Sequence, residues 1–198
     1  MKKNEKKEIG LFSGSFNPIH NGHLIMANYM SEFTYIDEVW LVVTPHNPLK
    51  ITRDMLNEQI RLKMVQLAIG KYKNLKAIDV ELHMKRPSYT INTLEKLSKD
   101  YPDCNFTLII GSDNWTFFDK WKDYKKIIES YKILIYPRQG SEIIIPDVWT
   151  HTIKIANAPV VEISSTFIRQ SIKVGKDMRA FIPPEVYDFI EDKKLYQI

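Results

Sequence analysis

Short aliphatic runs alternate along this chain with segments in which apolar residues recur at helical spacing. Such alternation is typical of βαβ units, in which helices cover a parallel sheet. The runs that we expect to be strands are 8–13, 38–44, 75–82, 105–111, 131–137 and 159–163. The segments that we expect to be helices are 21–33, 54–69, 90–101, 114–130, 164–175 and 183–195. The sequence therefore predicts an α/β fold with a doubly wound parallel sheet, and an irregular connection over 138–151.

The size and charge of the chain indicate one domain. Its 198 residues, 44% hydrophobic and 26% charged, are enough for one sizeable core and few for two ordinary domains. We expect a flexible charged tail over 1–8 and one domain over 9–198. The lysines and glutamates of that tail supply half of the formal net charge of +4, so the rest is close to neutral. This distribution does not favour a nucleic-acid partner.

Nothing in the sequence indicates a membrane or secreted protein. No apolar run approaches membrane-spanning length, and the charged start lacks the apolar core of a signal peptide. The single cysteine, Cys104, excludes an internal disulfide and a multi-cysteine metal site, and it suits a reducing compartment. We expect a soluble cytoplasmic protein with no membrane partner. The sequence leaves the oligomeric state open, a homo-oligomer included.

The stretch GLFSGSFNPIHNGHL, at 10–24, joins the first expected strand to the first expected helix. Parallel sheets bind ligands beyond the carboxyl ends of their strands, and helix N-termini attract anions. We expect Gly14 to take backbone angles closed to other residues, and Gly22 to allow a close approach to the helix start. His20 and His23 straddle that start, where their imidazoles would add donors to an anion site.

The same two histidines could instead ligate a metal, or only satisfy hydrogen bonds beneath a loop. The stretch has no cysteine or acidic residue that would complete a tetrahedral metal set. Its glycines, at 10, 14 and 22, also lack the G-x-G-x-x-G spacing of a dinucleotide-binding loop. The lack of further metal ligands and of the dinucleotide spacing favours an anion site.

A second candidate anion site follows the last expected strand, in the stretch ISSTFIR. Ser164 or Ser165 can cap the helix that begins there, and Arg169 lies on the same face one turn later. A plain helix cap with a surface arginine would give the same pattern. Lys50, in the loop after the second strand, either contacts phosphate or is a solvated lysine. Two anion-binding helix starts at one sheet edge suggest a polyphosphate lying across that edge.

Two of these stretches carry a family resemblance. GSFNPIHNGHL resembles the H-x-G-H signature of the α/β nucleotidyltransferases, and ISSTFIR resembles their second signature, S-S-T-x-I-R. Between them, PSYTINTL and GSDNWTFFDKW are similar to the nicotinate-nucleotide adenylyltransferase family. The resemblance spans 9–196 and implies a Rossmann-like fold. Ser15 stands where the family commonly has threonine and Asn17 where it commonly has aspartate, differences that bear on fine geometry.

The resemblance implies that a phosphate oxygen of nicotinate mononucleotide attacks the α-phosphorus of ATP, and that pyrophosphate leaves. The attacking phosphate is already ionised, so catalysis reduces to alignment and charge stabilisation. Mg²⁺ would bridge phosphate oxygens, with no metal site made by protein side chains.

The resemblance also assigns roles to residues. The catalytic set is His20, His23 and Arg169. The ATP-binding set is Gly14, Ser15, Phe16, His20, His23, Lys50, Gly111, Asp113, Ser164, Ser165 and Arg169. The substrate-binding set is Asn17, Tyr89, Thr90, Trp115, Phe117 and Trp121. Asp113 either accepts a hydrogen bond from the ATP ribose or caps its own helix. Unpaired helix amides near Thr90 and in 115–117 are expected to recognise the nicotinate carboxylate.

Other functions fit the signatures less well. The nearest is the same transfer to another phosphate acceptor, such as nicotinamide mononucleotide or phosphopantetheine, or with CTP to glycerol phosphate. The H-x-G-H sequence is also similar to that of class I aminoacyl-tRNA synthetases, but those need an additional tRNA-binding region. An inactive regulatory domain would be expected to have lost a phosphate-binding group, and none is missing here.

Overall fold

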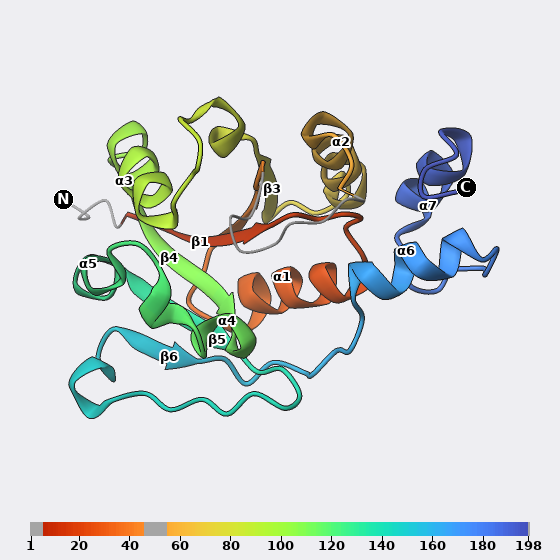
Figure 1. Ribbon diagram of the computed structural model, residues 1–198. Coiled ribbons are helices and arrows are strands. Elements are labelled where there is room, and N and C mark those ends of the chain that lie inside the picture. The colour runs from red at the N-terminus through yellow and green to blue at the C-terminus, as the bar shows by residue number, and fades with distance from the viewer. Residues whose placement is uncertain (1–5, 46–54, 198) are drawn as a thin grey trace.

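The computed structural model describes residues 6–45 and 55–197. Its centre is one six-stranded sheet with the order β3-β2-β1-β4-β5-β6, in which every neighbouring pair is parallel (Figure 1). The strands are β1 (Lys7–Gly14), β2 (Glu38–Val43), β3 (Leu75–Ile78), β4 (Cys104–Gly111), β5 (Lys132–Tyr136) and β6 (Ile153–Ile155). This order confirms the predicted doubly wound α/β sheet, which is Rossmann-like.

Helices cover both faces of the sheet, as predicted. The helices are α1 (Asn21–Phe33), α2 (Glu58–Ile69), α3 (Thr90–Asp100), α4 (Ser112–Trp115), α5 (Tyr124–Ser130), α6 (Ser165–Lys173) and α7 (Pro184–Asp192). Short 3₁₀ turns are η1 (Val80–His83), η2 (Phe118–Lys120) and η3 (Asp147–Trp149). One buried cluster joins the sheet to α1, α2, α6 and α7, and a second joins the other face to α3 and α5.

The alternation of side chains along β1 explains why one strand serves two cores. Phe12 belongs to the cluster with α1 and α2, whereas Leu11 belongs to the cluster with α3 and α5. Leu11 pairs with Trp40 of β2 and Leu108 of β4, which point to the same face. Because successive strand residues point to opposite faces, a strand covered on both sides is apolar at nearly every position.

Three predicted elements differ from the structure. The third strand ends at Ile78, and 80–83 form the turn η1. The single helix expected over 114–130 is divided into α4, η2 and α5, and the left-handed Asp123, with φ of 52°, separates η2 from α5. The strand expected over 159–163 is absent, and the sixth strand is β6, which lies earlier in the chain. Val160 is 54% exposed, so the apolar run there does not enter the core.

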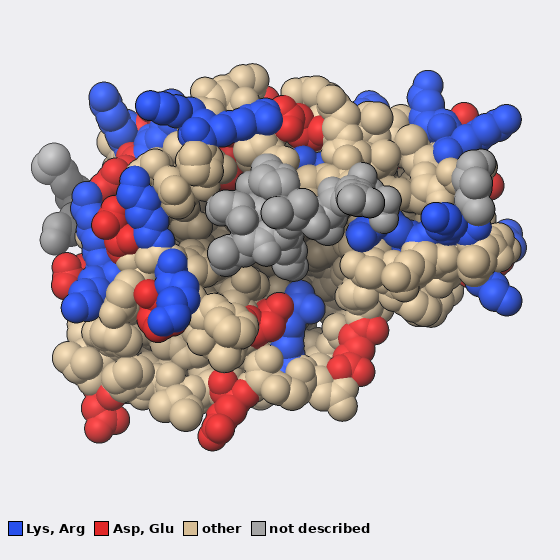
Figure 2. Space-filling model, viewed as in Figure 1, with Lys and Arg blue, Asp and Glu red and all other residues tan. Residues whose placement is uncertain are grey.

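Lys7 and Glu8, which the sequence places in the tail, are the first two residues of β1. Basic and acidic side chains are interspersed over α3 and α5 on the face seen in Figure 2. Within 6–45 and 55–197, no helix is both long and apolar enough to cross a bilayer.

Candidate active site

The strands β1 and β4 are neighbours in the sheet, but their following helices cover opposite faces. Such a switch point leaves a crevice beyond the carboxyl ends of the strands. A pocket of about 490 Å³ occupies this position. Its lining includes residues of the β1–α1 loop, the ends of β4 and β5, and the starts of α3 and α6. The structure thus brings both predicted anion sites to one cavity.

The β1–α1 loop turns tightly around Phe16, whose φ of 45° is unusual for a residue with a side chain. The Phe16 ring is buried and packs edge-on against Phe12, with ring centroids 5.9 Å apart. A Cβ atom at Gly14 would lie 2.9 Å from this ring. Gly14 is therefore required for space, and as the last residue of β1 it does not use the left-handed conformation open to glycine. Phe16, predicted to contact ATP, buries its ring and lines the pocket at the loop.

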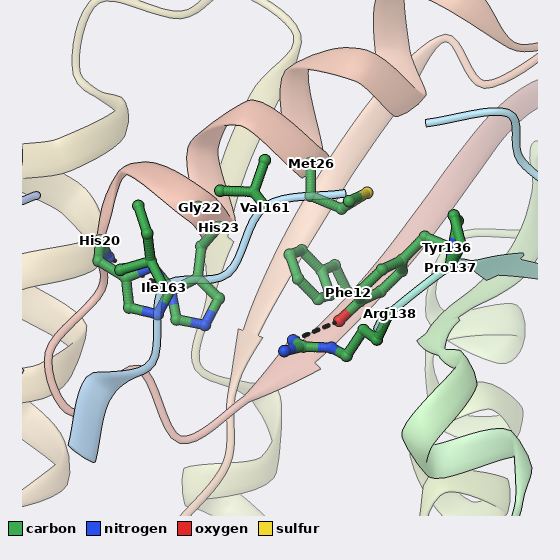
Figure 3. A pocket seen from close by; sticks show the side chains of 10 residues that line it. All are labelled: Phe12, His20, Gly22, His23, Met26, Tyr136, Pro137, Arg138, Val161 and Ile163. Carbon is green, nitrogen blue, oxygen red and sulfur yellow. Dashed lines mark hydrogen bonds between the residues drawn. The ribbon is translucent and has the colours of Figure 1, made fainter. Parts of the chain in front are cut away.

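The two histidines lie together at the start of α1. Their rings stack with centroids 3.7 Å apart, and Nδ1 of His23 accepts a hydrogen bond from the backbone N–H of His20 at 3.3 Å. A neutral His23 ring therefore carries its proton on Nε2, which is left to donate. Figure 3 shows both imidazoles on one side of a small hollow, with Tyr136 and Arg138 on the other. Gly22 leaves room for the His20 ring, since a Cβ there would lie 3.1 Å from His20 Nδ1.

Both imidazoles are neutral in the free protein. Burial, together with the nearby positive charge of Arg138, lowers the pKa of His20 to about 3. Burial, His20 and Arg138 hold the pKa of His23 well below its usual value of 6.5. Near neutral pH, the pair therefore offers N–H donors without positive charge.

Helix α6 is docked on the β1–α1 loop. Ser164 caps the helix by accepting a hydrogen bond from the Phe167 N–H at 3.1 Å. The Ser165 hydroxyl donates to the Pro18 carbonyl at 2.9 Å, and Arg169 Nη1 donates to the Asn17 carbonyl at 2.9 Å. Of the two possible caps, Ser164 is the cap, and Ser165 joins the two helix starts.

Asn17 faces the protein as well as the pocket. Its side chain is buried, and its Oδ1 accepts from the Tyr196 hydroxyl at 2.8 Å and from the Leu56 N–H at 3.4 Å. Asn17 also lines the pocket. The residue that stands in place of the family's aspartate therefore ties the loop to the C-terminal segment.

Arg61 of α2 supports the same loop, and the sequence analysis missed it. Its side chain is fully buried and donates to three carbonyls, those of Ser15 at 2.5 Å, Leu56 at 3.0 Å and Pro45 at 3.2 Å. The signal was present, because positions 61, 64, 65 and 68 are spaced as one buried helical stripe and an arginine occupies the first of them.

A second arginine, Arg138, also escaped the sequence analysis. Its Nε lies 3.2 Å from Asp113 Oδ1, its Nη2 donates to the Tyr136 hydroxyl at 3.0 Å, and its backbone N–H donates to Ser112 Oγ at 2.8 Å. A Cβ at Gly111 would lie 2.3 Å from Asp113 Oδ1, so glycine is needed there. Asp113 pairs with Arg138 and does not cap its own helix, because the N-cap of α4 is Gly111.

The far end of the pocket is aromatic. Tyr89 is the N-cap of α3, Thr90 is its first residue, and both line the pocket together with Trp121. Trp115 and Phe117 are not among the lining residues. Trp115 stacks on Phe118 outside the pocket and donates from Nε1 to the Ile144 carbonyl, while Phe117 is 61% exposed. The prediction that Trp115 and Phe117 line the same pocket as Trp121 is therefore not met.

Two lysines add positive charge at this aromatic end. The stretch GSDNWTFFDKW contains Lys120, and Lys122 follows it, although the sequence analysis considered only backbone amides as partners of a carboxylate. Both lysines line the pocket. Lys120 pairs with Asp119 at 2.9 Å, and Lys122 Nζ lies 4.6 Å from the centroid of the Tyr89 ring.

A family model described as "Cytidylyltransferase-like" matches residues 11–171. The chain belongs to this family. Two of its relatives, both named "Probable nicotinate-nucleotide adenylyltransferase", come from Bacteroides fragilis and Flavobacterium johnsoniae. The first is 50% identical over 92% of this chain and 90% of its own length, and the second is 47% identical over 96% and 99%.

A solved structure supports the same fold. A Plasmodium falciparum nicotinic acid mononucleotide adenylyltransferase, solved in complex with NaAD, matches with a TM-score of 0.79. The match covers 96% of this chain and 97% of that chain, at 22% identity. These comparisons confirm the family resemblance stated on the two signatures, since the cytidylyltransferase-like match contains both of them.

Two further expectations for a member of this family concern Lys50 and a metal. Lys50 lies outside the described residues. Within 6–45 and 55–197, no three His, Cys, Asp or Glu side chains gather closely enough to hold a metal ion.

The neutral histidines make stability depend on pH. Unfolding releases His20 and His23 to protonate near pH 6.5, so the unfolded state binds more protons below that value. Their stabilising contribution is therefore complete above about pH 6.5 and is lost as the pH falls towards 3. We expect the free energy of unfolding, measured in urea from pH 7.5 to 5, to fall by at most about 1.4 kcal/mol per pH unit for each histidine.

The variant His20→Asn should flatten this dependence, because one titrating group is gone. His151→Asn, at an exposed position, should keep the native slope. A His20→Asn protein with the native slope would contradict the assignment of a neutral, buried imidazole.

Proposed function

We propose that the chain transfers the adenylyl group of ATP to nicotinate mononucleotide, giving deamido-NAD and pyrophosphate. One observation carries the proposal: a single pocket runs from the histidine pair and Arg169 to Thr90 and Trp121. An anion-binding end and an aromatic end are thus continuous, as a reaction between a triphosphate and a pyridine nucleotide requires. The names of the relatives support this substrate pair.

The phosphate end fits a transfer that needs no protein nucleophile. The acceptor phosphate is ionised near neutral pH, so neutral imidazoles have no proton to remove from it. We propose that the free Nε2–H of His23 donates to the α-phosphate as charge builds up in the transition state. His20, stacked on His23, holds that ring in place and donates beside it.

The remaining groups at this end would hold ATP in place. Arg169, the start of α6 and Lys50 are proposed to contact the departing pyrophosphate. Asp113 is proposed to accept a hydrogen bond from the ribose, with Arg138 fixing its carboxylate. The pairing orients Asp113 before the nucleotide enters.

Mg²⁺ is proposed to enter with ATP. The donors at the phosphate end are N–H groups of histidine and arginine, which suit phosphate oxygens and leave the metal to be coordinated by those oxygens and water. When bound, Mg²⁺ neutralises charge on the phosphates.

Cytoplasmic location stays a prediction from the single, half-buried Cys104.

The aromatic end would hold the pyridine ring. Trp121 is half-buried and inclined by 45° to Phe118, with one side in the pocket. The N-terminus of α3 has no side-chain cap, so amides near Thr90 are open to a carboxylate. Lys122 adds positive charge on the same side.

The proposal is tested by product analysis. Purified protein is given ATP and Mg²⁺ with nicotinate mononucleotide, nicotinamide mononucleotide or phosphopantetheine in separate reactions. Chromatography of the nucleotides and an assay of pyrophosphate identify the acceptor. We expect deamido-NAD and pyrophosphate in equal amounts. Transfer to phosphopantetheine and to neither pyridine nucleotide would overturn the proposal.

Arg169 provides a second test. We expect Arg169→Ala to raise KM for ATP about 10-fold or more, because one hydrogen bond to a charged group contributes roughly 1.5 to 3 kcal/mol. KM for the mononucleotide should change little, since only ATP carries the departing phosphates. Lys173→Ala, an exposed change at the other end of α6, is the matched control. An equal rise for both substrates would instead indicate that the loop at Asn17 has moved.

A further inference from the structure

A buried carboxylate lies beside the aromatic end of the pocket and has no part in the mechanism above. Glu81 belongs to η1, between β3 and α3, and only 4% of it is exposed. It lines the pocket together with Ser88, Tyr89 and Thr90. Burial raises the pKa of this carboxyl, so placing it here costs free energy.

Two hydroxyl groups satisfy the carboxylate, and they come from either side of the α3 N-terminus. Ser88 Oγ donates to Oε2 at 2.9 Å, and Thr93 Oγ1 donates to Oε1 at 2.9 Å. Ser88 precedes the N-cap Tyr89, whereas Thr93 lies in the first turn of the helix. Glu81 therefore joins the incoming loop to the helix it leads into.

The two hydrogen bonds to Glu81 flank the residues that are proposed to contact the acceptor. Tyr89 and Thr90 lie between the two hydroxyl donors in the sequence. The side chain of Tyr89 does not cap α3, so the first N–H groups of the helix are not held by a capping side chain. Their direction therefore depends on how the segment before α3 enters the helix. An apolar residue at position 81 would avoid the cost of burial but would release both hydroxyls.

We propose that Glu81 is a positioning residue for the acceptor nucleotide, because its two hydrogen bonds fix the Tyr89–Thr90 segment against the pocket. This inference rests on the proposed function. It concerns binding of the mononucleotide and leaves the adenylyl-transfer groups untouched, since His23 and Arg169 lie at the other end of the pocket.

Steady-state kinetics of two substitutions test the inference. Glu81→Leu keeps a similar volume and removes both acceptors, so KM for nicotinate mononucleotide should rise about 10-fold. KM for ATP and kcat should change less than about 3-fold, because the phosphate end is intact. Glu81→Gln can accept from one hydroxyl and donate to the other, so it should restore most of the native KM.

Thr107→Val is the matched control. Its hydroxyl is also buried and bonds to Tyr35 at 3.2 Å, but Thr107 is not among the residues that line the pocket. The variant should lose stability without a change in KM. If Glu81→Leu does not fold, Thr93→Val removes one donor and keeps the side-chain shape, and it should raise the same KM by a smaller factor.

A thermal-shift experiment gives a readout without turnover. Nicotinate mononucleotide should raise Tm of the native protein and of Glu81→Gln, and much less that of Glu81→Leu, whereas ATP should stabilise all three. An unchanged mononucleotide KM in Glu81→Leu would overturn the positioning role alone, as would equal rises in KM for both substrates. A native protein that neither binds nor uses the mononucleotide would overturn the proposed function itself, and this inference with it.

Discussion

Replacing His23 with alanine is expected to lower kcat by about 10²- to 10³-fold, the usual effect of removing one preorganised donor. The imidazole is neutral, and its Nδ1 is already used by the His20 N–H, so Nε2–H is the group that is lost. A donor that acts mainly on the developing charge contributes little to the ground state. The binding of ATP should therefore change far less than kcat.

Quenched-flow or steady-state kinetics, together with ATP titration by calorimetry, separate these two effects. His151→Ala, in the exposed turn after η3, is the control and should keep native values. Since His23 also packs against Phe16, with centroids 5.0 Å apart, the unfolding curve must be measured alongside. A folded His23→Ala protein with native kcat would show that the transition-state role is wrong.

The second large effect is a preference for nicotinate over nicotinamide mononucleotide, expected to be about two orders of magnitude in kcat/KM. The two acceptors differ by a carboxylate against a neutral amide. Two hydrogen bonds to a charged group, each contributing roughly 1.5 to 3 kcal/mol, are enough for this factor. The open amides of α3 provide donors, and Lys122 provides positive potential beside them. The NH₂ group of nicotinamide mononucleotide is itself a donor, so it cannot accept a hydrogen bond from these groups.

Trp121→Ala separates stacking from charge recognition. Either ring loses the same stacking surface, so both acceptors should weaken by a similar factor while the preference for the acid survives. Trp115→Ala is a matched control, because Trp115 packs on the same Phe118 but lies outside the pocket lining. Measuring kcat/KM for both acceptors with all three proteins tests the assignment. Equal use of acid and amide by the native protein would contradict it.

The sequence predicts the sites whose residues are consecutive. His20 and His23 flank a helix start, as do Ser164 and Ser165, so a strand followed by a helix is enough to place them. The sequence does not show that the starts of α1 and α6 lie together. The Ser165 hydroxyl donates to the carbonyl of Pro18, which is 147 residues earlier in the chain, and only the tertiary structure reveals this contact.

The residues that the sequence analysis missed depend on long-range placement. Arg138 follows a strand end without a motif, and it gains its role only because β5 lies beside β4. Glu81 falls where a continuing strand was expected, and the turn η1 directs it inward. The predicted strand over 159–163 is absent, and Val160 within it is 54% exposed, because a short apolar run does not by itself show that a segment enters the core.

The three carbonyls held by Arg61 belong to segments that follow β1, follow β2 and precede α2. A guanidinium has five N–H groups in one rigid plane, so it serves acceptors that a lysine ammonium would reach only in part. Just beyond the end of α2, Lys71 forms an ion pair with Glu185 of α7. A small shift of α2 would thus displace the β1–α1 loop and the segment after β2 together. If the proposed site is correct, substitutions between α2 and α7 are expected to alter kcat through the position of this loop, although no residue of either helix lines the pocket.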